Sequence, residues 1–242
     1  EFFPSVSYPL NRIGNPETTV FFDIETTGFS RTHDHIYLIG CVWQDKTSWQ
    51  MIQWFAEDAA DETRLLCSFF RFLKNFQFLV HFNGDRFDIP FILSRCSEHG
   101  LDFCFDALKS VDIYRLIRPF RRLLGLESLK QKSIENFLGL ERTDQYSGGE
   151  LTEVYRKYLL TKNSRLEHLL LLHNEDDLKG MPDILPILCY PDFFRSSFSF
   201  CGQKLREITD YSGKKEKELI LTYKNPVCRP ARTEFSAGIF LL

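Results

Sequence analysis

Apolar residues in the first quarter of the chain alternate in the way that strands do. Residues 18–25 are β-branched and aromatic and stop at Thr27-Gly28, which predicts a strand. Residues 35–43 and 48–55 have the same character and are separated only by a short polar turn. The three segments therefore predict a three-stranded antiparallel run.

The spacing of apolar residues then becomes helical. Residues 61–75 place their large apolar side chains on one side of a helix. A short apolar strand at 78–82, a helix at 89–98 and a strand at 107–112 are expected next, and helices continue to about residue 190. This order of elements predicts an α/β sandwich around a mixed sheet.

Changes in residue composition along the chain predict three parts. Residues 1–17 are rich in Pro and Gly and predict an irregular arm, and residues 18–190 form the expected main domain. Residues 191–242 predict an appendage of uncertain order, in which 218–223 and 232–242 look strand-like.

Composition and charge narrow the function classes. The chain has 30 Lys and Arg against 33 Asp and Glu, a formal net charge of −3, which excludes a polycationic binder of nucleic acid. No apolar stretch approaches the roughly 20 residues of a membrane span, and the first residues lack the features of a signal peptide. Seven Cys without a Cys-x-x-Cys pair predict reduced, buried thiols. We therefore expect a cytoplasmic protein that does not associate with membranes.

The first candidate for chemistry lies at the end of the first strand. Asp23 and Glu25 alternate with Phe22 and Ile24, so both acids point to one face. Two acids on so apolar a strand are costly unless a divalent cation neutralises them. The alternative is that this face is wet and the acids are solvated.

The second candidate follows the strand at 78–82. Asn83 and Asp88 lie in the loop after the carboxyl end of that strand, where open α/β sheets place their sites. Asp88 also precedes an apolar helical run with Pro90 in its first turn, so it could instead serve only as a helix cap.

The third candidate ends an apolar helical stripe. Leu166, Leu170, His173 and Asp177 share one helix face. A polar helix end with a satisfied boundary histidine is the alternative. Asp176 lies about 100° around the helix from Asp177.

In their order and spacing these three motifs resemble those of the DEDD superfamily of metal-dependent 3′–5′ exonucleases. The resemblance covers about residues 18–180, and Asp-x-Glu-Thr-Thr-Gly at 23–28 is its most specific part. It is greatest to a bacterial family of predicted ribonuclease-H-like exonucleases, related to the proofreading domains of B-family DNA polymerases. The segments 128–130 and 135–140 also look like that branch. The resemblance implies a ribonuclease-H-like three-layer sandwich with a mixed five-stranded sheet flanked by helices.

The resemblance also implies a mechanism with two Mg²⁺ or Mn²⁺ ions. Asp23 would bridge both ions, Glu25 and Asp177 would complete the site of one, and Asp88 would serve the other through water. Asp176 is the alternative ligand if the helix register differs. His173 occupies the position of a tyrosine in one large subgroup, where an imidazole could position or deprotonate the attacking water.

Contacts to the substrate are predicted in two places. The Thr26-Thr27 backbone and Asn83 would hold the terminal nucleotide, as the resemblance implies. Six basic residues and one acid lie between 115 and 132, a local excess that suits a phosphate backbone. The basic residues are Arg115, Arg118, Arg121, Arg122, Lys130 and Lys132. A solvated helical face is the alternative, and we expect Arg118, Arg121 and Arg122 to contact substrate.

The expected function is hydrolysis of single-stranded DNA or RNA ends from 3′ to 5′. Two other functions remain open from the residues alone. One is a catalytically inactive nucleic-acid- or protein-binding module on the same fold, since fold does not guarantee activity. The other is a ribonuclease-H-like endonuclease.

Overall fold

A computed structural model describes residues 10–46, 48–140, 148–209 and 213–224. The chain divides into two compact units, 1–186 and 187–242, and the described residues of each are treated separately. The sequence-based limit at residue 190 falls within a helix, Cys189–Arg195. The domain limits of the sequence analysis stay a prediction.

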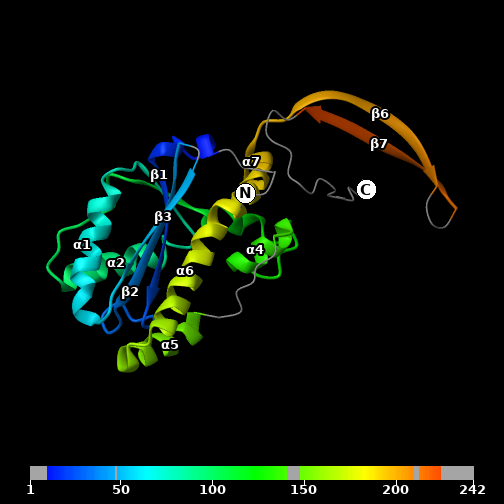
Figure 1. The fold of residues 1–242 in the computed structure, drawn as a ribbon. Coiled ribbons are helices and arrows are strands. Elements are labelled where there is room, and N and C mark those ends of the chain that lie inside the picture. The colour runs from blue at the N-terminus through cyan, green and yellow to red at the C-terminus, as the bar shows by residue number, and fades with distance from the viewer. Residues whose placement is uncertain (1–9, 47, 141–147, 210–212, 225–242) are drawn as a thin grey trace. The chain divides into compact units, whose positions relative to one another are not determined.

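Five strands form the mixed sheet of the first unit. They are β1 (Thr19–Thr26), β2 (Ile36–Asp45), β3 (Ser48–Phe55), β4 (Phe78–His81) and β5 (Lys109–Asp112). Their order across the sheet is β3-β2-β1-β4-β5. β1 pairs antiparallel with β2 and β2 with β3, the three strands labelled in Figure 1. β4 runs parallel to β1, and β5 runs parallel to β4. The predicted mixed five-stranded sheet is confirmed.

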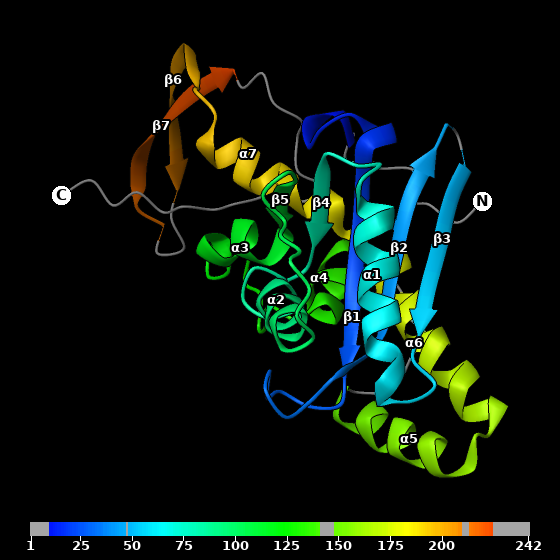
Figure 2. The same ribbon diagram turned by 90° about the vertical axis from the view of Figure 1, so that its left-hand side faces the viewer.

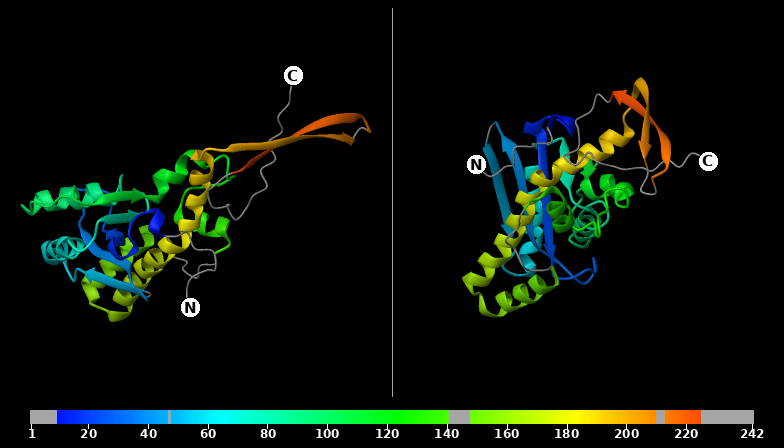
Figure 3. Two further views of the ribbon diagram at one scale, coloured as in Figure 1. Left: turned by 90° about the horizontal axis from the view of Figure 1, so that it is seen from above. Right: turned by 90° about the vertical axis from the view of Figure 1, so that its right-hand side faces the viewer.

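Helices cover both faces of this sheet. On one face lie α1 (Glu62–Leu73) and α2 (Asp88–Glu98), and on the other lies α6 (Ser164–Ile184) (Figure 2). α4 (Gln131–Leu138) and α5 (Gly148–Thr161) pack against α6. In the right-hand view of Figure 3, α6 runs diagonally across the blue strands. The predicted three-layer sandwich is therefore confirmed.

Close packing of α6 against β2 depends on one glycine. β2 is buried from Ile36 through Val42 because both faces of the strand are covered. At Gly40, a Cβ atom would lie 2.1 Å from Asn174 Oδ1 and 2.4 Å from Leu178 Cδ1. A glycine within the strand thus lets the helix approach the sheet closely.

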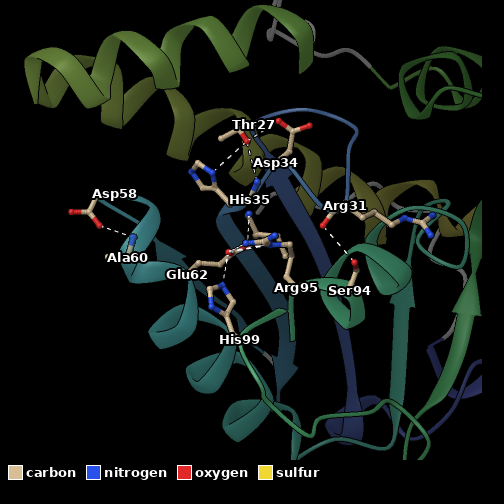
Figure 4. Close-up of polar contacts among 11 residues, drawn as sticks. Thr27, Arg31, Asp34, His35, Asp58, Ala60, Glu62, Ser94, Arg95 and His99 are labelled. Atoms are coloured by element: carbon tan, nitrogen blue, oxygen red, sulfur yellow. Dashed lines mark hydrogen bonds and ion pairs between the residues drawn. The ribbon is translucent and has the colours of Figure 1, made fainter. Parts of the chain in front are cut away.

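The opposite face of the sheet is tied by one buried carboxylate. Glu62, the first residue of α1, accepts a hydrogen bond from the Ile36 amide of β2 at 2.8 Å. Arg95 and His99, which follow one another by a turn at the end of α2, contact the same carboxylate, each at 2.7 Å (Figure 4). Burial would raise the pKa of Glu62, but the hydrogen bonds from Arg95, Ile36 and His99 outweigh it and lower that pKa. The acid is therefore fully compensated by its neighbours.

Short elements complete the first unit. The 3₁₀ turns η1 (Leu10–Arg12) and η2 (Pro16–Thr18) occur in the described part of the predicted arm. The others are η3 (Ala59–Asp61), the short helix α3 (Ile113–Ile117), η4 (Arg118–Phe120) and η5 (Leu185–Leu188), which reaches into the second unit.

The second unit contains a helix and a hairpin. α7 (Cys189–Arg195) is followed by the antiparallel strands β6 (Ser199–Thr209) and β7 (Lys215–Lys224). The strand-like 218–223 of the sequence analysis lies within β7, whereas 232–242 lies outside the described residues. The appendage predicted to be of uncertain order is thus regular in its described part.

The structure also bears on the expectations about membrane spans and cysteines. Within the described ranges, no helix combines the length and apolar character needed to cross a membrane. Of the six described cysteines, Cys41, Cys96 and Cys189 are buried. Cys104 and Cys201 are exposed, so the expectation of generally buried thiols was wrong for these two.

Candidate active site

The carboxylates of β1 point toward α6. Phe22 and Ile24 pack into the core cluster that includes α1, and Asp23 and Glu25 alternate with them onto the other face. Both acids are only partly exposed. The face predicted from alternation is thus the one covered by α6, so the alternative of a simply solvated pair does not describe it.

Asp88 enters the site from the start of α2. The helix begins at Asp88 itself, and no side-chain hydrogen bond caps it at the preceding Phe87. The helix-cap alternative for Asp88 is therefore wrong, because the cap position is Phe87 and Asp88 is the first residue of the helix. Its carboxyl is 6% exposed and lies near the amide of Ile24 on β1.

α6 supplies the remaining two predicted side chains. His173 Nε2 lies 3.2 Å from Asp177 Oδ2 and 3.7 Å from Glu25 Oε1. Potential ligand atoms of Glu25, His173 and Asp177 all lie within 4.8 Å of one another. Asp176 does not belong to this group. The predicted helix register, which placed His173 and Asp177 on one face, is the one observed.

Mutual repulsion and burial perturb the acids of this site. Burial raises the pKa of Asp23 well above its usual value, and the charges of Asp88, Glu25 and Asp177 raise it further. Burial also raises the pKa of Asp88 to about 7, and Asp112 adds to that shift. Among the described residues, Asp23 and Asp88 therefore have acidic neighbours and no Lys or Arg that lowers their pKa.

One residue of the site was missed by sequence reasoning. Asn174, fully buried on α6, donates from Nδ2 to Asp23 Oδ2 at 2.9 Å. Its Oδ1 accepts from Gln53 Nε2 at 2.9 Å, which fixes the orientation of the amide. Asp23 pairs in register with Gly40, the glycine over which Asn174 lies. A lone glycine in an apolar strand was the available signal for this close approach.

The two predicted threonines organise the turn after β1. Thr26 Oγ1 donates to the Gly28 carbonyl at 2.7 Å. Thr27 Oγ1 lies 3.3 Å from Asp34 Oδ1 and accepts from the His35 amide at 3.0 Å (Figure 4). Both hydroxyls thus stabilise the turn through hydrogen bonds. A contact of this turn with substrate stays a prediction.

Asn83 lies just after β4, and the three predicted arginines lie in and just after η4. Asn83 follows β4 with φ +64°, and its amide donates to Asp112 Oδ1 at 3.0 Å. Arg118 and Arg122 are exposed. Arg121 donates to the backbone carbonyls of Leu126 and Glu127, so its guanidinium holds a loop in addition to any role toward substrate. The substrate roles of all four residues stay predictions.

The donor set fits divalent metal ions. Four carboxylates and one imidazole converge, and hard cations such as Mg²⁺ and Mn²⁺ prefer oxygen ligands. Burial and neighbouring acids raise the pKa of Asp23 and Asp88, so positive charge nearby would favour their ionised forms. Bound cations would supply that charge.

Comparisons with known proteins agree with this architecture. A family model described as the RNase H superfamily matches residues 20–188. Among solved structures, the fold is similar to a family B DNA polymerase from the hyperthermophilic archaeon Pyrobaculum calidifontis, with a TM-score of 0.56 and 12% sequence identity. The likeness covers 79% of this chain but only 33% of that polymerase. A search of curated proteins finds no significant match.

Proposed function

We propose that this chain, which belongs to the RNase H superfamily, is a metal-dependent nuclease that shortens single strands of nucleic acid from the 3′ end. One observation carries the proposal. Asp88, Glu25 and Asp177 come from three separate elements and are close enough to Asp23 to raise its pKa. Such a costly arrangement of like charges is typical of a functional site.

Each side chain of the cluster has a role in this proposal. Asp23, Glu25, Asp88 and Asp177 would hold two Mg²⁺ or Mn²⁺ ions. When bound, these ions supply charge neutralisation at the phosphate and lower the pKa of a water molecule. Asn174 holds the Asp23 carboxylate in one orientation through its hydrogen bond.

His173 is proposed to handle the proton. Its Nε2 is close to the carboxylates of Asp177 and Glu25. These carboxylates would stabilise the imidazolium cation that forms when the ring takes a proton from water. The ring is 8% exposed, so packing keeps its orientation while one edge reaches the site. His173 is therefore our candidate for the general base.

The proposed substrate is a single strand of DNA or RNA. The likeness to part of a DNA polymerase agrees with nucleic acid as the substrate class. The choice between sugars depends on how a site treats the 2′-hydroxyl, which has to be measured. A cytoplasmic location also stays a prediction.

The proposal is tested by digesting 5′-labelled single strands of DNA and RNA with Mn²⁺, each with a free or a blocked 3′ end. We expect stepwise shortening from free 3′ ends only, and no shortening with Asp23→Ala. Asp45→Ala is the matched control, because Asp45 is an exposed acid at the far end of β2. His173→Ala tests the proposed base by its rate at saturating Mn²⁺.

Two outcomes would refute the exonuclease and support another function. Cleavage of a circular single strand into fragments would identify an endonuclease. Retained binding without cleavage, and without a rise in melting temperature on adding Mn²⁺, would identify a binding module.

A further inference from the structure

One pocket is lined by none of the four carboxylates but includes two of the predicted substrate residues, Asn83 and Arg121. It has a volume of about 490 Å³, which is in the range of small-ligand sites. Three segments line it: Phe82 and Asn83 after β4, Tyr114 in α3, and the loop from Arg121 to Lys130. All three belong to the first unit of the chain.

Two of these segments lead directly into the candidate active site. The loop that begins with Phe82 and Asn83 continues to Asp88 at the start of α2. Lys130 immediately precedes Gln131, whose Nε2 donates to the backbone carbonyl of Asp177 at 3.0 Å. The pocket walls are therefore anchored to the same backbone that carries two of the four acids.

A single buried carboxylate fixes the first two walls. Asp112 Oδ1 accepts from the Asn83 amide at 3.0 Å and, as the cap of α3, from the Arg115 amide at 3.1 Å. The first bond holds Asn83 in its left-handed backbone conformation, and the second sets the start of the helix that carries Tyr114. Asp112 is 1% exposed. The rings of Phe82 and Tyr114 consequently meet edge to face, with their centroids 6.0 Å apart.

The third wall is also held by its own hydrogen bonds. Arg121 donates to two carbonyls of its loop, and the Lys130 amide donates to Ser128 Oγ at 3.3 Å. The Lys130 side chain is exposed, and within the described ranges no carboxylate pairs with it. The pocket lining thus combines two aromatic rings, Phe82 and Tyr114, with two cationic side chains, Arg121 and Lys130.

We propose that this pocket binds one nucleotide of the single strand, upstream of the terminal nucleotide that is cleaved, with its base against Tyr114 and its phosphate near Lys130. Aromatic rings accept any base by stacking, and a neighbouring cation accepts the backbone phosphate. The inference rests on the proposed function, since it assigns a second subsite to the same substrate. Arg121 keeps the loop in place and adds positive charge to that wall.

The test measures binding of a 5′-fluorescein-labelled single-stranded DNA 12-mer by anisotropy in EDTA, with strand integrity checked on a gel. Tyr114→Leu should weaken binding about tenfold, the size expected for loss of one stacked base. Tyr114→Phe retains the ring and should bind as the wild type does. Lys130→Gln should weaken binding less and reduce the salt dependence by about one phosphate contact. Lys74→Gln, at an exposed position after α1, is the control for Lys130.

A strand with one abasic position at a time locates the nucleotide. At one position upstream of the 3′ end, removing the base should weaken wild-type binding and leave Tyr114→Leu with no further loss. Equal binding by Tyr114→Leu and wild type would overturn the inference. The inference would also be overturned if Tyr114→Leu weakened binding equally for every abasic strand, whatever the abasic position. Melting curves establish that the variants are folded.

The result separates this inference from the proposed function. Strand shortening with Mn²⁺ but no dependence of binding on Tyr114 or Lys130 refutes the pocket and leaves the exonuclease. Binding that depends on both residues without any shortening supports the pocket and refutes the exonuclease.

Discussion

Asp88 and Glu62 are both buried carboxylates at helix N-termini, and they lie on different elements with opposite electrostatic surroundings. Glu62 receives hydrogen bonds from Arg95, His99 and the Ile36 amide, and its pKa is lowered. Asp88 is buried with acidic neighbours, and its pKa is raised to about 7. Three hydrogen-bond donors compensate the first acid, whereas no Lys or Arg of the described residues lowers the pKa of the second. Under the proposed function, this difference separates an acid that holds the fold from an acid that belongs to the metal site.

The largest expected effect is on activity. Asp23→Asn removes the charge shared by the whole cluster, so hydrolysis of a labelled strand should fall by a factor of about 10³ or more. The metal-free protein should stay folded and become at least as stable, because Asn cannot ionise in a position where burial and neighbouring acids disfavour a charge. Calorimetry with and without Mn²⁺ measures the second effect. Marked destabilisation without metal would contradict our interpretation of the cluster.

The next largest effect is on stability, and it concerns Glu62, the buried acid with a lowered pKa. Glu62→Gln should lower the free energy of unfolding by about 3 kcal/mol, because it leaves Arg95 without a charged partner in a buried site. Urea unfolding measures this change. Arg64→Ala is the control: its ion pair with Asp61 is exposed, with Arg64 70% accessible, and it should cost less than about 0.5 kcal/mol. Equal effects of the two substitutions would refute the structural role of Glu62.

The two acids should also respond to pH with opposite signs. The folded protein holds a proton on Asp88 between its ordinary pKa of 3.8 and about 7, so its contribution to stability falls as pH rises through that window. Asp88→Asn should remove at least about 2 kcal/mol of this pH-dependent loss in the metal-free protein. The lowered pKa of Glu62 instead contributes stability above its unfolded pKa, which is lost as pH falls.

Measurements of melting temperature against pH in EDTA test both signs. With Mn²⁺ added, the wild type should gain more stability above pH 7 than at pH 5.5, since the metal competes with protons for the same carboxylates. A gain that does not depend on pH would contradict the assignment of Asp88 to the metal site.

The smallest effect is expected at the residue that joins the cluster to the sheet. Asn174→Ala removes a side-chain hydrogen bond to Asp23 and leaves Gln53 without its amide partner. The pKa of Asp23 should rise further, so the activity profile should shift to higher pH while maximal activity falls about tenfold. Leu172→Ala is the control on the exposed side of the same helix. A fall in activity with an unchanged pH profile would mean that Asn174 serves packing alone.

The sequence by itself determined the elements and the local faces of this protein. Alternation placed Asp23 and Glu25 opposite Phe22 and Ile24, and helical spacing placed His173 with Asp177, because both patterns depend only on backbone periodicity. Element ends were less secure: Asp88 begins α2, where a capping position was equally compatible with the sequence.

Only the tertiary structure decided which distant residues meet. Gly40 admits α6 close to β2, and this brings Asn174 to Asp23, 151 positions apart in sequence. The pocket between Phe82, Tyr114 and Lys130 likewise depends on Asp112 joining two segments. Gly40 signals a close approach but does not identify Asn174 as the partner, and the pocket has no local signature. Both arrangements arise from the packing of elements whose own patterns do not specify their partners.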